Sequence, residues 1–190
     1  VMPPWGGNKP LFSTSPLAAG IPTKPATIID LATSAVARGK IAAKAQKNEA
    51  LELGWAFDES GQPTTDAKVA LKGMLAPLGG VKGYALAVLV ESLTGALIGP
   101  KLAADIPDMF DNEKSALSQD ISHFVIAIKA EALTVDGNNH LSDLSTRVDS
   151  VGARMPGKNR KDPFAIDDNA EITITDSVAA ELAEWSQKLS

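Results

Sequence analysis

Cysteine is absent from the 190-residue chain, and so are the short motifs that mark several common enzyme classes. Without cysteine the chain has no disulfide, no thiolate nucleophile and no cysteine-ligated zinc, and its composition fits a reducing compartment, so we expect a cytoplasmic protein. No G-x-G-x-x-G sequence follows a candidate strand, which argues against an ordinary Rossmann domain. The G-x-S-x-G and H-E-x-x-H sequences are missing as well, so the usual serine hydrolase and zinc protease signatures are excluded.

Basic residues are too scattered to predict a nucleic-acid surface. The formal net charge is −5, and no basic stripe interleaved with aromatic residues occurs. The most apolar stretch, residues 84–98, is interrupted by Glu91, Ser92 and Thr94, so it is too short and too polar to cross a bilayer. It predicts a buried core helix instead. We therefore expect neither a nucleic acid nor a membrane as a partner.

The overall composition is that of an ordinary globular protein, with 44% hydrophobic and 22% charged residues. This length suits one domain, or one domain and a piece of another. The opening Val1-Met2-Pro3-Pro4-Trp5-Gly6-Gly7 has neither the charged start nor the long apolar core of a signal peptide. We expect that the chain begins within a fold and is a fragment of a longer protein.

Local patterns predict two strands separated by helices and loops. Apolar runs rich in β-branched residues predict the strands at residues 26–31 and 123–128. An extended piece at Trp55-Ala56-Phe57-Asp58 should end in a turn. Residues 1–25, which hold six prolines, and residues 99–120 are expected to be irregular.

Four helices are expected besides the apolar one. Thr33 or Ser34 would cap a helix that runs to about Asn48, and Thr65-Asp66 would cap a short helix that ends at Lys72, since a short polar side chain can accept from first-turn amides. The other two are an amphipathic helix over residues 139–153 and a capped helix over residues 176–189.

Three loops have the chemistry to hold an anion. Residues 30–34 join a strand to a helix, where free amides and the positive end of the helix dipole point at one spot. Residues 79–83, Gly-Gly-Val-Lys-Gly, let the backbone approach a ligand closely and add one cation. Residues 156–160, Pro-Gly-Lys-Asn-Arg, form a basic turn. Each has a plainer interpretation, respectively a capped helix, a flexible turn and a solvated loop.

The two histidines are the only side chains expected to titrate near neutral pH. His123 begins an apolar strand candidate, and His140 follows Gly137-Asn138-Asn139 in an expected turn. We interpret both as structural rather than catalytic, and no metal site is predicted.

Several short motifs, taken in order, carry a family resemblance over essentially the whole chain. They are Pro4-Trp5-Gly6-Gly7, Ser13-Thr14-Ser15-Pro16, Ile29-Asp30-Leu31-Ala32-Thr33-Ser34, Gly54-Trp55-Ala56-Phe57-Asp58, Pro77-Leu78-Gly79-Gly80, Lys82-Gly83-Tyr84 and Met155-Pro156-Gly157. The sequence resembles the C-terminal portion of type 2 malate/L-lactate dehydrogenases. The resemblance implies an α/β (α+β) fold with a largely antiparallel, non-Rossmann sheet and flanking helices. It assigns residues 1–135 to part of the NAD(P)-binding domain and residues 136–190 to a C-terminal helical segment that packs on a domain mostly absent here.

The resemblance also implies an activity. The full-length protein would be an NAD(P)H-dependent oxidoreductase that transfers hydride between nicotinamide and a 2-oxo or 2-hydroxy acid, while the 190-residue chain alone would be inactive. A reductase of cyclic imines such as Δ1-piperideine-2-carboxylate or Δ1-pyrroline-2-carboxylate is an alternative, and a non-catalytic binding module is another. Relatives commonly form homodimers with composite sites, so we expect a homodimer.

Carried over position by position, the family's NAD or NADP contacts fall on the three loops described above. The implied contact residues are Ala26, Thr27, Ile28, Ile29, Asp30, Leu31, Ala32, Val81, Lys82, Gly157, Lys158 and Asn159. The family's catalytic histidine lies in a Ser-His-Gly motif that does not occur in residues 1–190. Two positions depart from the family pattern. Ser13-Thr14-Ser15-Pro16 replaces Gly-Thr-Asn-Pro, and Lys158-Asn159 stands where an acid often follows in relatives.

Overall fold

The computed structural model describes residues 1–107, 117–159, 167 and 169–189. Within it the chain forms two compact units, Val1–Lys158 and Asn159–Ser190. The second unit contains one described helix, α6 (Asp176–Leu189), and this confirms the helix predicted over residues 176–189. The first unit holds all residues of the three candidate loops except Asn159 and Arg160. Arg160 lies outside the described residues.

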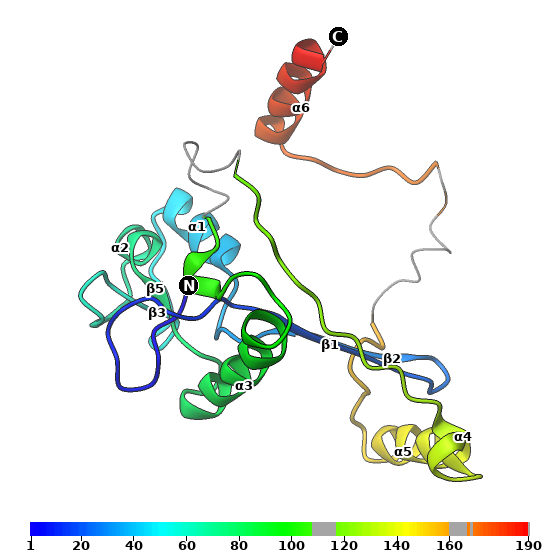
Figure 1. The fold of residues 1–190 in the computed structure, drawn as a ribbon. Coiled ribbons are helices and arrows are strands. Elements are labelled where there is room, and N and C mark those ends of the chain that lie inside the picture. The colour runs from blue at the N-terminus through cyan, green and yellow to red at the C-terminus, as the bar shows by residue number, and fades with distance from the viewer. Residues whose placement is uncertain (108–116, 160–166, 168, 190) are drawn as a thin grey trace. The chain divides into compact units, whose positions relative to one another are not determined.

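The first sheet is a hairpin of two antiparallel strands, β1 (Pro16–Ile21) and β2 (Thr27–Ala32) (Figure 1). Its register pairs Pro16 with Ala32 and Ile21 with Thr27. The hydroxyls of Thr23 and Thr27 lie 2.7 Å apart, and the Thr23 hydroxyl also donates to the Pro25 carbonyl at 2.7 Å, so the turn satisfies its buried polar atoms. The strand predicted over residues 26–31 is confirmed, displaced by one residue.

The second sheet has three short antiparallel strands, with β3 (Ala56–Phe57) between β4 (Pro63–Thr64) and β5 (Met74–Leu75). The predicted turn after Asp58 is confirmed, because its carboxylate accepts from the Ser60 hydroxyl and from the amides of Ser60 and Gln62. These hydrogen bonds favour the charged form and lower the pKa of Asp58, with the Ser60 hydroxyl first among the causes.

Both sheets are therefore antiparallel, and the fold is mixed α/β with small antiparallel sheets. Helix α2 (Ala67–Lys72) packs on β4 and β5. Its predicted cap is confirmed, since the Asp66 carboxylate accepts from the amides of Lys68 and Val69 at 2.8 and 3.1 Å.

The predicted cap of the first helix is wrong. Helix α1 (Arg38–Lys47) begins after Ala37, which makes no side-chain cap bond. The Ser34 hydroxyl donates instead to the Val36 carbonyl at 2.9 Å, and the Ser34 backbone forms an antiparallel bridge with Pro77. Thr33 and Ser34 instead pair with the segment that follows β5, so the helix begins several residues later, at Arg38.

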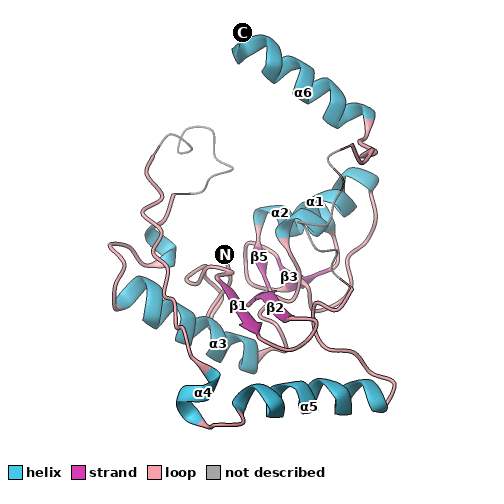
Figure 2. Cartoon of the chain, turned by 90° about the vertical axis from the view of Figure 1, so that its right-hand side faces the viewer, coloured by secondary structure: helices cyan, strands magenta, loops and turns pink. Residues whose placement is uncertain are grey.

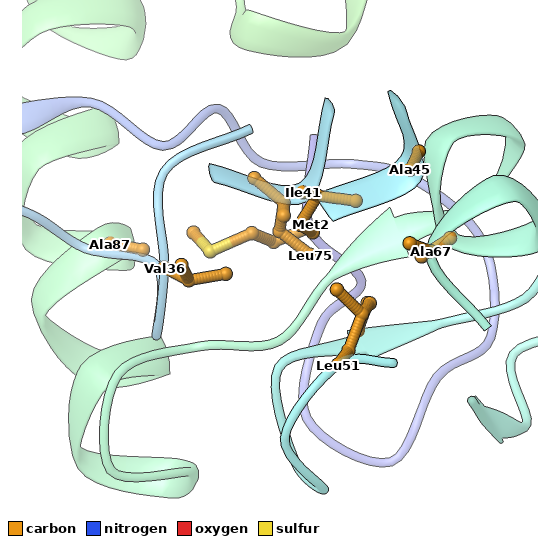
Figure 3. Packing of buried hydrophobic residues seen from close by; sticks show 10 residues of the cluster. Met2, Val36, Ile41, Ala45, Leu51, Ala67, Leu75 and Ala87 are labelled. Carbon is orange, nitrogen blue, oxygen red and sulfur yellow. The ribbon is translucent and has the colours of Figure 1, made fainter. Parts of the chain in front are cut away.

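The hydrophobic core of the first unit lies between α1, α2 and the second sheet. Met2 and Ile41 are each 1% exposed, and Leu51 and Leu75 are nearly as well covered. Figure 3 shows these four side chains converging, with Val36 and Ala87 at one end of the cluster and Ala45 and Ala67 at the other. Burial of such apolar surface supplies the main stabilising term.

The apolar helix begins earlier and is more exposed than predicted. The α-helical part, α3 (Val81–Glu91), continues into a π-helical turn, η1 (Ser92–Ala96). Only one face packs inward, through Gly83, Ala87 and Val90, whereas Leu89 and Leu97 are 54% and 70% exposed. The prediction that the helix is buried all round is therefore wrong, because the described neighbours cover a single face. No helix among the described residues is long and apolar enough to cross a membrane.

The strand predicted over residues 123–128 is also wrong. This segment is extended but belongs to no sheet, and Figure 2 draws it as loop. Val125, Ile126 and Ile128 are 84%, 68% and 70% exposed. A strand requires a neighbouring strand for its amides and carbonyls, and the described part of the chain supplies none here. Local composition predicted the extended conformation correctly but could not provide the pairing.

We expect the backbone amides of residues 123–128 to exchange with solvent deuterium rapidly in the 190-residue chain. None of them donates a hydrogen bond within the described residues, so no opening step should be needed before exchange. The amides of β2 that pair with β1 are the internal control and should exchange slowly. Mass spectrometry of peptides covering the two segments would check this. Slow exchange at residues 123–128 would contradict the description of an unpaired segment.

The remaining helices of the first unit are η2 (Ala103–Asp105), α4 (Ala130–Leu133) and α5 (Gly137–Ser150). The helix predicted over residues 139–153 is confirmed with different ends, since it begins two residues earlier and stops before Gly152, whose φ is +73°. Residues 108–116 of the predicted irregular stretch lie outside the described residues.

Candidate functional site

Strand β2 is the element to which all three candidate loops attach within the first unit. At its C-terminal end, the amide of Leu78 donates to the Thr33 carbonyl at 2.9 Å, and the amide of Ala35 donates to the Ala76 carbonyl at 2.7 Å. Near its start, the amide of Ile28 donates to the Pro156 carbonyl at 3.2 Å. Loops that are about 50 and 125 positions farther along the chain are therefore hydrogen-bonded to the same strand.

Strand geometry divides the predicted β2 contacts between two faces. Ala26, Ile28 and Asp30 are exposed, whereas Thr27 is 1% exposed and Thr33 is fully buried. Ile29, Leu31 and Ala32 have intermediate exposure. The consecutive run from Ala26 to Ala32 thus offers a ligand mainly the side chains of alternate residues, and the buried hydroxyls hold the strand in place.

Gly157 allows the third loop to approach β2 closely. Its φ is +79°, and a Cβ atom built there would lie 2.9 Å from the Ile28 carbonyl oxygen and 3.0 Å from the Ile28 Cβ and amide nitrogen. Any other residue would be strained and would push the loop away from the strand. The loop therefore reaches the strand through a glycine that the sequence analysis placed in the candidate site.

The glycine loop before α3 is tightly folded. Gly79 and Gly80 have φ values of +58° and +66°, and the Gly80 amide donates to the Pro77 carbonyl at 3.2 Å. Helix α3 starts at the next residue, so the amides of its first turn have no acceptors within the helix. Val81 and Lys82 are exposed at this start. A cationic side chain and a positive helix end are thus presented together.

Lys158 has a partner that spacing alone did not reveal. Its Nζ lies 2.6 Å from the Asp149 Oδ1, and the two side chains are 39% and 44% exposed. The ammonium remains partly accessible, but a carboxylate already holds it. Asn159 is the first residue of the second compact unit, so it is not placed with the other candidates.

The sequence analysis missed Trp5 as a candidate site residue. The indole atoms Cζ3 and Cη2 lie 3.2 and 3.3 Å from where a Gly80 Cβ would be, and the residue is 59% exposed. The Pro4-Trp5-Gly6-Gly7 motif drew attention to this residue. Its contact with Gly80 could not be predicted, because the two residues are far apart in the sequence.

The histidines lie elsewhere in the first unit. His140 is exposed in the first turn of α5, and His123 is exposed in the extended segment before α4. Among the described residues, no group of three or more His, Cys, Asp or Glu residues could hold a metal ion.

The chain is mixed α/β with small antiparallel sheets, and its glycine loops are hydrogen-bonded at and just beyond the strand β2. The sequence profile described as malate/L-lactate dehydrogenase matches residues 1–183. The chain belongs to the malate/L-lactate dehydrogenase family, which confirms the resemblance inferred from its motifs.

Two curated relatives indicate the range of the family. The chain is 38% identical to the Δ1-pyrroline-2-carboxylate/Δ1-piperideine-2-carboxylate reductase of Pseudomonas aeruginosa, over 94% of this chain and 55% of that protein. It is 35% identical to the NADP+-dependent (2R)-3-sulfolactate dehydrogenase of Chromohalobacter salexigens, over 84% of this chain and 48% of that protein. The chain therefore spans about half the length of the curated relatives it matches.

Solved structures agree with this assignment. A dehydrogenase from Sinorhizobium meliloti superposes with a TM-score of 0.68 at 32% identity, covering 97% of this chain and 50% of that one. A Δ1-piperideine-2-carboxylate reductase from Pseudomonas syringae gives the same TM-score at 30% identity, covering 82% of this chain and 48% of that one.

Proposed function

We propose that the full-length protein is an NAD(P)H-dependent oxidoreductase and that this chain supplies part of its dinucleotide site. The observation that carries the proposal is the attachment of both glycine loops at the same strand, to Ile28 in β2 and to Thr33 directly after it. The proposed contact residues are those carried over from the family, with the exposed members Ala26, Ile28, Asp30, Val81 and Lys82 as the principal ones. Gly157 and Lys158 would complete the site from the third loop.

The fit of a dinucleotide to these residues rests on space and charge. Gly79 leaves the backbone bare where a ligand would approach, because a Cβ atom there would meet nothing within 4 Å. Lys82 and Lys158 supply cations for phosphate groups, in a chain whose net charge is −5. When bound, the cofactor supplies the hydride. The role of this chain is to bind and orient it.

The proposed reaction places hydride on the carbon beside a carboxylate of a 2-oxo acid, and a proton is added to the carbonyl oxygen to give the 2-hydroxy acid. Residues 1–190 contain no Ser-His-Gly motif, so we propose that the proton comes from a histidine in a part of the full-length protein that this chain does not include. His123 and His140 are not proposed for that role. The 190-residue chain alone is expected to be inactive.

A cyclic imine reductase is the second candidate, because relatives named for Δ1-pyrroline-2-carboxylate and Δ1-piperideine-2-carboxylate reduction share 34–47% identity with this chain over the matched residues. The two reactions use the same hydride donor, and in the imine reaction the proton is added to nitrogen. We further propose that residues 1–135 belong to the cofactor-binding domain and residues 136–190 to a helical segment. A cytoplasmic homodimer is our working assembly.

Turnover by the full-length protein would test the proposal. Reduction of pyruvate and of Δ1-piperideine-2-carboxylate should be measured with NADH and with NADPH, and oxidation of malate with NAD+ and with NADP+. The absorbance of the reduced nicotinamide follows each reaction. Turnover of either substrate class with either cofactor supports an oxidoreductase and selects between the two candidates. Cofactor binding without any turnover would favour the non-catalytic binding module, and failure to bind either cofactor would refute the proposal.

Asp149→Asn in the full-length protein is expected to strengthen cofactor binding by a factor of up to about five. The substitution removes the carboxylate that holds the Lys158 ammonium at 2.6 Å, and an exposed ion pair of this kind is worth about 0–1 kcal/mol. Lys158 is then available to the dinucleotide phosphates. Asp143→Asn is the matched control, because Asp143 pairs with Arg147 on the same helix. If the dissociation constants of Asp149→Asn for NADH and NADPH both equal those of the parent protein, Lys158 is removed from the proposed site.

A further inference from the structure

Trp5 lies at the tip of a loop whose two ends, Met2 and Phe12, are hydrogen-bonded to each other at the core. The Met2 amide donates to the Phe12 carbonyl at 2.7 Å, and the Phe12 amide donates back to the Met2 carbonyl at 3.0 Å. Met2 is 1% exposed, so the base of the loop is fixed. Within the loop, the Gly7 amide donates to the Pro4 carbonyl at 2.9 Å, which closes a turn around Trp5.

The indole of Trp5 covers Gly80 and leaves most of its own surface uncovered. Its Cζ3 and Cη2 atoms lie where a side chain at Gly80 would otherwise project, and 59% of the residue is exposed. A second contact holds the same region, because the rings of Phe12 and Tyr84 meet edge to face with centroids 5.4 Å apart. The loop containing Trp5 is therefore docked on the start of α3.

Burial of a large aromatic side chain is strongly stabilising, since a tryptophan can bury roughly 150–250 Å² of surface. Trp5 instead remains largely open beside two positive-φ glycines and an exposed lysine, Lys82. Flat aromatic surface next to bare backbone and a cation matches a ligand that combines a planar ring with phosphate groups.

We propose that Trp5 is a cofactor-binding residue whose indole packs against a planar ring of the dinucleotide held by the Gly79–Lys82 loop. This inference rests on the proposed dinucleotide site and adds a residue to it that the family correspondence did not include. The shared chemistry is ring stacking, through either the nicotinamide or the adenine, and the oxidised and reduced cofactors provide separate tests of it.

Intrinsic fluorescence of the full-length protein provides the direct measurement. NAD+ and NADP+ should quench the fluorescence that Trp5 contributes, which is the part of the emission that Trp5→Phe lacks. Quenching by the oxidised cofactors requires close contact with the indole ring. Trp185→Phe is the matched control, since Trp185 is 53% exposed on α6 and is not part of the proposed site. The quenching should persist in Trp185→Phe and should disappear in Trp5→Phe.

Binding and kinetics provide the second readout. Trp5→Ala should raise the cofactor dissociation constant and KM roughly tenfold, consistent with an aromatic pair worth about 0.5–1.5 kcal/mol beyond its buried area. Trp5→Phe and Trp5→Tyr should restore most of the affinity, and kcat should change little. The melting temperature of Trp5→Phe checks that the loop remains folded.

The outcomes separate this inference from the proposed function. If Lys82→Ala weakens cofactor binding while Trp5→Ala binds like the parent protein, the role of Trp5 is refuted and the proposed site stands. If the parent binds neither NADH nor NADPH, both are refuted. Quenching that is the same in the parent and in Trp5→Phe also refutes the inference.

Discussion

Alanine at position 83 is expected to lower the free energy of unfolding by about 3 kcal/mol, at the upper end for forcing an extra group into a packed site. A Cβ on Gly83 would lie 1.9 Å from the Leu78 carbonyl oxygen and 2.7 Å from the Leu78 carbonyl carbon and amide nitrogen. These are backbone atoms, so no side-chain rotation can relieve the clash. The turn between β5 and α3 must move instead, and we expect cofactor binding to weaken with it.

Gly39→Ala is the matched control for that prediction. Gly39 lies in α1 with a Cβ position that meets nothing within 4 Å, and its φ is not positive. The same chemical change should therefore stabilise the protein by about 0.4–1 kcal/mol, because alanine loses less backbone freedom on folding. Urea unfolding of the two variants would measure both effects. Equal stability of Gly83→Ala and the parent would contradict the tight packing of the loop.

Lys82→Ala in the full-length protein is expected to weaken cofactor binding by about 1.5–3 kcal/mol, the range for a hydrogen bond to a charged group. Lys82 lies in the first turn of α3, between Gly80 and Gly83, where backbone and ammonium can both approach an anion. Affinity should also become less dependent on salt, since one ionic contact is lost. Fold stability should change little because the side chain is exposed.

Calorimetric titration of NADH and NADPH into parent and Lys82→Ala proteins would measure this change. Lys68→Ala is a suitable control, because Lys68 is an exposed lysine in the first turn of α2, which is not part of the proposed site. Dissociation constants that match the parent for both cofactors would remove Lys82 from the site and leave it as a solvated turn residue.

The sequence predicted those elements whose causes are local. The strand at β2 follows from its β-branched residues, and the start of α2 follows from Asp66, whose carboxylate needs only the next three residues to form a cap. The turn after Asp58 is local for the same reason. Helix α6 was predicted with its observed bounds.

The sequence failed where the outcome depends on distant neighbours. Residues 123–128 have strand composition, but a strand needs a partner that composition cannot specify. Helix α3 is apolar on all sides, yet its burial depends on how many elements pack on it, and the described ones cover one face. Thr33 and Ser34 could cap a helix equally well, but pairing with Ala76–Leu78 decides their conformation.

The candidate site shows the same division. The three loops could be selected by their glycines and basic residues, but their attachment to one strand depends on hydrogen bonds between Thr33 and Leu78 and between Ile28 and Pro156. The ion pair of Lys158 with Asp149 and the position of Trp5 over Gly80 are likewise contacts between residues distant in sequence. The family correspondence supplied the identity of the ligand, which geometry alone does not specify.

A crystal structure of the full-length protein with NADH or NADPH would test the central claim most directly. We predict a dinucleotide along the exposed side of β2, near Ile28 and Asp30, with its phosphates within reach of Lys82 and one of its rings against Trp5. A cofactor bound away from β2, with no contact to the Gly79–Lys82 loop or to Gly157, would contradict it.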